Sequence, residues 1–261
     1  MKTATLAELG PAFPYLKTPF TTKPWRGKEE RAISLDLGRP GTEQVNARVI
    51  ATILSVILEN IQGTQWKDWD LAKRKRHILE ERFAGDGLYA YCYVRRECVG
   101  NLLAITFECP ACGEKNNWKG DLDTLEVKIV ENESEVLTEY KLRDGIDFGG
   151  KKIDLLIVRS TTLASAMSLV DSEEEVALHL IRNSCSTKEG FPLADPAVDL
   201  LSKRDIQALV DEISNVNIGP NFRSEVECGK CKVKITAALD LWYEPFFDTS
   251  SPSSMRTLIV A

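Results

Sequence analysis

The 261-residue chain is 43% hydrophobic and 28% charged, an ordinary composition for a globular protein of one large or two small domains. A formal net charge of −6 disfavours a general nucleic-acid binder, because phosphate contacts require a basic surface. Seven cysteines, an odd number, favour a reducing compartment over a secreted disulfide framework. The sequence predicts neither a signal peptide nor a membrane segment.

Residues 1–41 are predicted to form an extended N-terminal arm. Prolines recur along it at spacings that exclude a single helix: Pro11, Pro14, Pro19, Pro24 and Pro40. Aromatic residues lie between them, namely Phe13, Tyr15, Phe20 and Trp25. Because aromatic side chains need a surface to bury against, such an arm either lies on its own domain or docks on a neighbouring subunit. Apolar and polar residues alternate from Arg31 to Leu37, which is typical of a short strand.

Residues 42–100 are predicted to be a helical region. Thr42 can cap a first helix, whose apolar residues recur at helical spacing as far as Ile61. Gly63 can end that helix, because glycine accepts the left-handed backbone of a helix C-terminus. A second helix is expected over residues 65–83.

Two features of this region have open interpretations. The basic run Lys73–His77 forms either a solvated helix face or a nucleic-acid contact. Gly85–Gly87 is expected to break the second helix, after which residues 88–99 resume as helix or strand. Cys92 and Cys98 lie here, and burial is the commoner fate of such cysteines.

Residues 101–160 are predicted to be β-rich and to contain a first Cys-x-x-Cys knuckle. A strand from Leu102 to Glu108 leads into Cys109-Pro110-Ala111-Cys112-Gly113, whose proline and glycine suit a tight turn. A turn is expected at Asp144-Gly145. Alternating apolar residues predict further strands at Leu125–Val130, Val136–Leu142 and Lys152–Arg159.

A helical insertion is predicted over residues 161–218. Thr161–Leu169 is expected to be helical, and capping-box patterns at Ser172 and Ser202 precede two further helices. Together with the strands before it, the middle of the chain is expected to pack on the hairpins that carry the knuckles, not to form a free linker. Cys185 lies in this region without a partner in the sequence.

Residues 219–248 are predicted to contain a second knuckle and a returning strand. The knuckle is Cys228-Gly229-Lys230-Cys231, and the strand runs from Lys232 to Leu241. Lys232 stands where the first knuckle has a glycine. Aromatic residues follow from Trp242 to Phe247, and residues 249–261 form a Ser-rich tail.

Together the two knuckles supply four thiolates, the ligand set of a closed tetrahedral zinc site: Cys109, Cys112, Cys228 and Cys231. A two-residue spacer lets both sulfurs of one turn face one metal ion, although 115 residues separate Cys112 from Cys228. Such a site is structural, since it leaves no position for a substrate water. The alternatives are two separate redox or disulfide motifs, or incidental cysteines.

These features predict an α+β fold with N-terminal helices, a β-rich centre that carries a zinc-ribbon-like site of four cysteines, and a helical insertion between the two knuckles. We expect no enzyme, because the sequence contains no Gly-rich phosphate loop, no His-Glu-x-x-His and no Gly-x-Ser-x-Gly motif. The chain also has only two histidines, so few residues are available for acid–base catalysis by histidine.

Several short motifs follow one another in an order that extends through most of the chain. They are Trp69-Asp70-Leu71, Tyr93-Val94-Arg95-Arg96 with Gly100, Phe107-x-Cys109-Pro110-x-Cys112-Gly113, Asp121-Leu122 with the strand at Leu125, the helix at Ser202–Ile213, Gly219-Pro220, the second Cys-x-x-Cys, and Phe246-Phe247. This order resembles the baseplate hub and hub-assembly proteins of T4-type contractile-tailed bacteriophages. Lys232 and the N-terminal arm depart from the family pattern.

The resemblance implies a structural or assembly role in a phage tail baseplate, without catalysis. It implies other baseplate and tail proteins as partners, in a symmetric assembly. The protein would reside in the virion and, during assembly, in the host cytoplasm. We expect residues 1–30 and 242–261 to be the main partner-binding segments, because aromatic side chains anchor protein interfaces.

The alternative function is a zinc-ribbon nucleic-acid-binding regulator. It would use the basic run Lys73–Arg76 and the cluster Lys230, Lys232 and Lys234. The acidic charge of the whole chain makes nucleic acid the less favoured partner.

Overall fold

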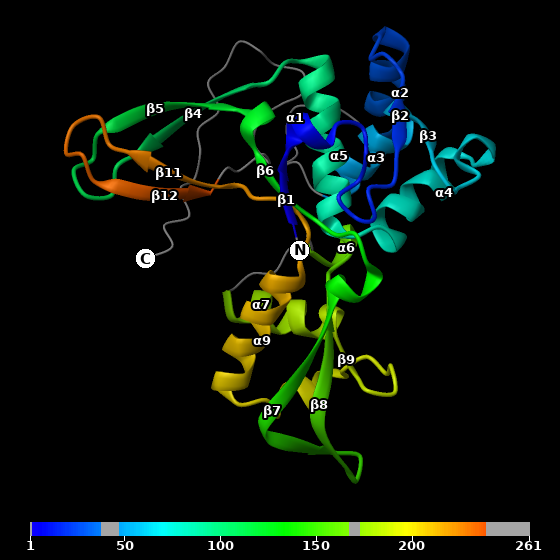
Figure 1. Ribbon diagram of the computed structural model, residues 1–261, viewed down its shortest axis with the longest axis vertical. Helices are drawn as coiled ribbons and strands as arrows, with labels where there is room; N and C mark the ends of the chain where they lie inside the picture. The colour runs from blue at the N-terminus through cyan, green and yellow to red at the C-terminus, as the bar shows by residue number, and fades with distance from the viewer. Residues whose placement is uncertain (1, 38–46, 167–172, 239–261) are drawn as a thin grey trace.

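The computed structural model describes residues 2–37, 47–166 and 173–238. Within these ranges the chain is mixed helix and strand and gathers into three lobes, each with a hydrophobic cluster of its own. Figure 1 shows the helical N-terminal lobe at the upper right, the hairpin lobe at the left, and the insertion lobe below. None of the helices in the described ranges combines the length and apolar character that crossing a bilayer demands.

The N-terminal lobe is built around one helix that is buried on nearly all sides. In α3 (Ala47–Ile57) every residue from Val49 onward is buried, which marks a central helix. The helices α4 (Leu71–Arg76) and α5 (Ala84–Cys98) pack against it. Trp66 in the 3-10 turn η1 (Trp66–Asp68) is fully buried, and its indole N–H donates to the Leu58 carbonyl at 2.9 Å.

The N-terminal segment is not the extended arm that the sequence predicts. It forms β1 (Lys2–Thr5), α1 (Leu6–Leu9), β2 (Phe20–Thr22) and α2 (Gly27–Leu37), and most of its large apolar side chains pack in or against the core of its own lobe. Phe13 and Phe20 are at most 2% exposed, with ring centroids 4.8 Å apart. Of the two interpretations of this segment, the structure favours the one in which it lies on its own domain, because its aromatic residues already have a surface to bury against.

Residues 31–37 form a helix where a strand was expected. The alternating residues Ile33, Leu35 and Leu37 fit a strand period, but only two of them lie on the core face. Ile33 and Leu37 are four residues apart and share one side of a helix, whereas Leu35 is 79% exposed. The apolar pattern was too short to distinguish the period of a helix from that of a strand.

Three further boundaries differ from the predicted ones. The first helix ends at Ile57 and the chain continues as β3 (Leu58–Ile61), which pairs with β2. The second predicted helix is divided into η1, α4 and a π-helical turn, η2 (His77–Glu81). Gly85–Gly87 does not break a helix but forms the first turn of α5. The predicted cap Thr42 lies outside the described residues.

A small antiparallel sheet connects the lobes. Its strand order is β1–β6–β10, with β6 (Glu126–Ile129) in the middle and β10 (Gly219–Pro220) on one side. The chain enters the insertion after β6 and returns to β10, the neighbouring strand, so both ends of the insertion lie side by side (Figure 1). At this junction the Gly85 backbone lies directly against Ile218 and Gly219.

The insertion lobe is a three-stranded sheet covered by helices, the mixture expected for the middle of the chain, although the stretch predicted as helical also contributes one strand. After the short turn η4 (Glu133–Val136), its strands are β7 (Leu137–Phe148), β8 (Lys151–Arg159) and β9 (Cys185–Thr187). Its helices are α7 (Glu173–Ser184), α8 (Asp195–Val198) and α9 (Lys203–Val216). They enclose a separate apolar cluster, so the lobe folds on its own core and not on the hairpins, contrary to expectation.

Two details of the insertion correct the predicted boundaries. The turn expected at Asp144-Gly145 is an irregularity inside β7, and the hairpin turns instead at Gly149-Gly150, where both glycines have positive φ. The short helix α6 (Leu163–Ala166) packs against the N-terminal lobe and not in the insertion lobe, since Leu163 is buried in the N-terminal core. Ser172 and residues 167–169 lie outside the described residues.

Asp205 joins α9 to the sheet of the insertion lobe. Its carboxylate is 2% exposed and accepts hydrogen bonds from the Tyr140 hydroxyl at 3.1 Å, the Arg143 backbone N–H at 3.2 Å and the Ser202 hydroxyl at 2.8 Å. The Ser202 hydroxyl accepts the Asp205 backbone N–H at 3.2 Å, so Ser202 is the N-cap of α9, although the reciprocal backbone bond of the predicted capping box is replaced by the bond between the two side chains.

Replacing Asp205 with alanine is expected to destabilise the protein by about 3 kcal/mol, because buried donors would lose a charged acceptor. Urea denaturation followed by circular dichroism would measure this loss. Asp211→Ala, on the exposed side of the same helix, is the control and should change stability by less than about 0.5 kcal/mol. Equal effects of the two substitutions would contradict the bridging role of Asp205.

The hairpin lobe consists of two antiparallel hairpins from distant parts of the sequence. The strands β4 (Leu102–Glu108) and β5 (Lys115–Asp121) form the first hairpin, and the turn η3 (Leu122–Thr124) follows it. The strands β11 (Arg223–Glu227) and β12 (Lys234–Ala238) form the second. Figure 1 shows the two hairpins side by side. The aromatic segment and the tail, residues 242–261, lie outside the described residues.

Candidate metal centre

The first knuckle is a tight turn closed by two backbone hydrogen bonds. The Cys109 N–H donates to the Glu114 carbonyl at 2.8 Å, and the Gly113 N–H donates to the Cys109 carbonyl at 2.8 Å. Gly113 has φ +68°, a conformation that glycine adopts without steric cost. This turn places Cys109 and Cys112 on the same side of the hairpin end.

The second knuckle repeats this geometry in a different sequence. The Cys228 N–H donates to the Val233 carbonyl at 3.0 Å, and the Lys232 N–H donates to the Cys228 carbonyl at 3.1 Å. Lys232 has φ +62°, the same left-handed conformation as Gly113 in the first turn. The lysine that departed from the sequence pattern therefore occupies the equivalent backbone position, at a steric cost that glycine avoids.

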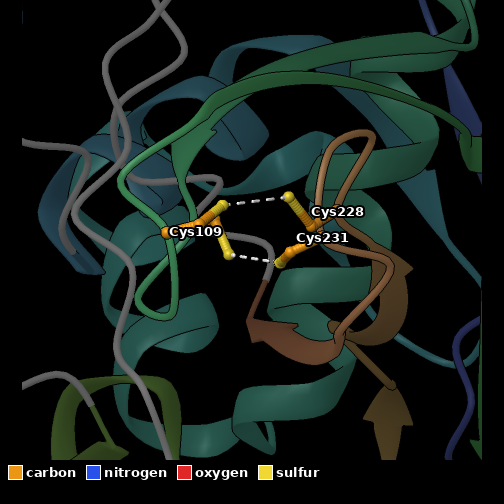
Figure 2. Close-up of side chains that lie close together, drawn as sticks. Cys109, Cys228 and Cys231 are labelled. Carbon is orange, nitrogen blue, oxygen red and sulfur yellow. Dashed lines mark hydrogen bonds between the residues drawn. The ribbon is translucent and has the colours of Figure 1, made fainter.

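The four predicted cysteines come together at the ends of the two hairpins. The Cys109 and Cys231 sulfurs are 3.6 Å apart, those of Cys112 and Cys228 are 3.7 Å apart, and all four lie within 4.8 Å of one another. Figure 2 shows the sulfurs of the two knuckles facing each other. A zinc ion bound at 2.3 Å by four sulfurs in a tetrahedron would place them about 3.8 Å apart, close to the observed spacing.

This arrangement gathers the cysteines of both knuckles into one cluster, not into two separate pairs. Each of the two short sulfur–sulfur distances crosses from one hairpin to the other. A disulfide would need sulfurs about 2.05 Å apart, far closer than those observed. The cluster can therefore hold one metal ion between the hairpins, and the set of donors is thiol alone.

The two inner ligands are sealed from solvent. Cys109 is 1% exposed and Cys228 is 0% exposed, and they pack with Val226 and Ile235 in the core of the hairpin lobe. Cys112 is partly buried and Cys231 is exposed. A metal ion held here would be enclosed on its protein side and coordinated by four protein ligands, as in structural sites.

The backbone of the second knuckle favours the charged form of its first cysteine. The Cys231 backbone N–H donates to the Cys228 sulfur and lowers the pKa of Cys228 to about 6. Cys112 also accepts a backbone N–H, from Glu114, but burial and the neighbouring thiols outweigh that bond and raise its pKa to about 12. Four thiolates at this separation repel one another, so a cation is needed to hold all of them ionised.

Comparison of the chain with protein-family models, curated proteins and solved structures found no match. The support for a function therefore comes from the sequence and geometry of the chain itself.

Sequence reasoning missed one residue of this site. Asn116 lies on β5 of the first hairpin, yet its side chain contacts the second knuckle through Gly229 and Cys228. An Asn-Asn pair beside a knuckle has no distinctive pattern, so the sequence carried no signal of this contact. The Lys230 ammonium, 3.3 Å from the Glu114 carboxylate, adds an exposed ion pair across the same two hairpins.

The three remaining cysteines do not join the site. Cys92 is fully buried in the N-terminal core and Cys185 is buried in the core of the insertion lobe. Burial raises the pKa of each of these two thiols to about 12, which keeps them neutral and unreactive. Cys98, at the end of α5, is exposed and lies outside the four-cysteine cluster.

Proposed function

We propose that the four cysteines hold one structural zinc ion and that the hairpin lobe is zinc-ribbon-like. The spacing of the sulfurs and the donor set of four thiols support zinc, because tetrahedral all-sulfur sites suit this ion. The zinc would tie the middle of the chain to its C-terminal part. Its role would be structural, since the four cysteines fill the coordination sphere.

We further propose that the protein is a structural component of a contractile phage tail baseplate hub, or a factor that assists hub assembly. The order of motifs in the sequence supports this family. The structural observation behind the proposal is the four-cysteine cluster, which brings two hairpins from distant parts of the chain together in one lobe. Such a body suits a protein that acts through interfaces with other baseplate and tail proteins and that requires no catalysis.

The C-terminal residues 242–261 remain the proposed partner-binding segment. Their aromatic residues begin at Trp242, four positions after the end of β12, the strand that leaves the second knuckle, and aromatic side chains anchor protein interfaces. Truncation after residue 241 is expected to leave the three lobes folded and to abolish incorporation into the assembly. Circular dichroism and assembly with baseplate proteins would measure the two outcomes, and normal assembly of the truncated chain would contradict the assignment.

Mass spectrometry of purified tail particles tests the proposed location. A permanent hub component is expected in mature particles at a fixed ratio to other baseplate proteins. An assembly factor is expected to bind baseplate proteins in infected-cell extracts and to be absent from mature particles. Absence from both samples would refute the baseplate proposal in either form.

The alternative, a nucleic-acid-binding regulator, is less well supported because its basic residues have intramolecular partners. The Lys73 ammonium lies 4.5 Å from the centroid of the Trp69 ring, and Lys75 forms a 2.6 Å ion pair with Asp36. On the hairpins, Lys230, Lys232 and Lys234 each face a glutamate at 3.3–3.7 Å. These contacts reduce the positive potential that phosphate binding requires.

A binding assay at several salt concentrations separates the two functions. A nucleic-acid binder would lose affinity steeply as salt rises, because phosphate contacts release counterions. The baseplate proposal predicts no such binding to double-stranded DNA or RNA at physiological salt. Tight binding with a steep salt dependence would favour the regulator instead.

A further inference from the structure

The side chain of Asn116 uses both ends of its amide at the boundary between the two hairpins. Its oxygen accepts the Gly229 backbone N–H at 2.8 Å. Its nitrogen donates to the Glu114 carbonyl at 2.8 Å and lies 3.6 Å from the Cys228 sulfur, within hydrogen-bond distance for sulfur. One side chain therefore contacts both knuckles and one of the four metal ligands.

The orientation of this amide is determined by its partners. The Gly229 N–H can only donate, so it requires the amide oxygen of Asn116. The Glu114 carbonyl can only accept, so it requires the amide nitrogen. The nitrogen thus presents its second N–H toward the sulfur of Cys228, and the rotated amide would lose all three contacts.

We propose that Asn116 is a positioning residue of the metal centre, which docks the second knuckle on the first and holds Cys228 in place as a ligand. This inference rests on the proposed metal site. The Asn116 amide joins the Cys231 backbone N–H as a donor to the buried Cys228 sulfur, and a hydrogen bond to a thiolate stabilises the anion that the metal requires. Asparagine supplies that hydrogen bond without adding a charge beside four thiolates.

The proposal explains how two hairpins from distant parts of the sequence meet in register. Gly229 lies directly after Cys228, so its bond to Asn116 fixes the start of the second knuckle. The exposed Lys230–Glu114 ion pair contributes attraction between the same hairpins, but solvent screens it. Asn116 thus prepares the site before the metal binds, which lowers the entropic cost of bringing four ligands together.

The experiment compares metal binding by the full chain and three variants, with Zn²⁺ in competition with a chromophoric chelator and with Co²⁺ as a spectroscopic probe. Asn116→Ala removes all three contacts and is expected to weaken metal affinity about 10- to 100-fold. Asn116→Asp keeps an acceptor for Gly229 but loses the donor to Cys228 and adds a charge, so it should weaken affinity at least as much. Asn117→Ala, the same change on the opposite face of β5, is the matched control and should bind like the native chain.

The Co²⁺ spectrum separates positioning from simple loss of structure. The charge-transfer bands report the electron density on the sulfurs, so Asn116→Asp is expected to shift them while the far-ultraviolet circular dichroism stays native. If Asn116→Asp binds Zn²⁺ as tightly as the native chain, with an unshifted Co²⁺ spectrum, Asn116 is not a positioning residue. If the native chain itself binds neither ion, the proposed zinc site fails, and that result is distinct from failure of the Asn116 inference alone.

Discussion

Replacing Cys228 with serine is expected to abolish zinc binding and to unfold the hairpin lobe while the other two lobes remain folded. Cys228 is the most deeply buried of the four ligands, and among the side chains that the structure describes Val226 and Ile235 pack with the cysteines. Two hairpins joined through four metal ligands depend on the metal for stability, because metal binding supplies folding free energy directly. The N-terminal and insertion lobes have large cores of their own.

Two measurements check this expectation. Elemental analysis under reducing conditions should find about one zinc per native chain and none in the variant. Amide hydrogen exchange in β4, β5, β11 and β12 should accelerate by more than about 1000-fold, with little change in α3 or α9. Cys98→Ser, a change at an exposed cysteine outside the cluster, is the control and should keep both zinc and protection. Full zinc occupancy in Cys228→Ser would refute the assignment of the site.

Replacing Gly85 with alanine is expected to destabilise the whole protein by about 4 kcal/mol or more. A Cβ at Gly85 would collide with the backbone of Ile218 and would lie 2.8 Å from the Gly219 nitrogen. Backbone atoms held in a sheet cannot move aside as a flexible side chain can, so α5 and β10 would have to separate. That contact fixes the exit of the insertion against the N-terminal lobe.

Chemical denaturation would measure the effect of Gly85→Ala on the free energy of unfolding. Gly27→Ala is a matched control, because a Cβ there meets nothing within 4 Å and lies at the start of α2. It should be neutral or should stabilise the protein by up to about 1 kcal/mol. A loss of less than about 1 kcal/mol for Gly85→Ala would show that the two backbones are not in tight contact.

The sequence predicted which four cysteines come together because spacing within each knuckle is a local property. Cys109 and Cys112 belong to one turn, as do Cys228 and Cys231, and alternating residues around them indicated strands. The same local reasoning failed where the decisive contact is distant. Gly85 was interpreted as a helix breaker. Its lack of a side chain instead allows β10, far along the chain, to pack closely against α5.

Other features had no signal that the sequence could provide. The helix at residues 27–37 could be predicted only by knowing which residues face the core. The exposed Leu35 made the apolar pattern look like the two-residue period of a strand. The burial of Phe13 and Phe20 required the partner surfaces of α3 and α5, which lie elsewhere in the chain. Asn116 gained its role only when the second hairpin was placed beside it.

The placement of the insertion on two neighbouring strands has a consequence for the order of events during synthesis. The first pair of cysteines emerges from the ribosome 115 residues before the second pair, a delay of roughly 6–23 s at typical elongation rates. The insertion has its own core and can fold within that delay. Because its two ends meet at β6 and β10, its folding returns the nascent chain to the waiting first hairpin. Zinc capture would then be the last step, and it would occur only in chains whose insertion has already folded.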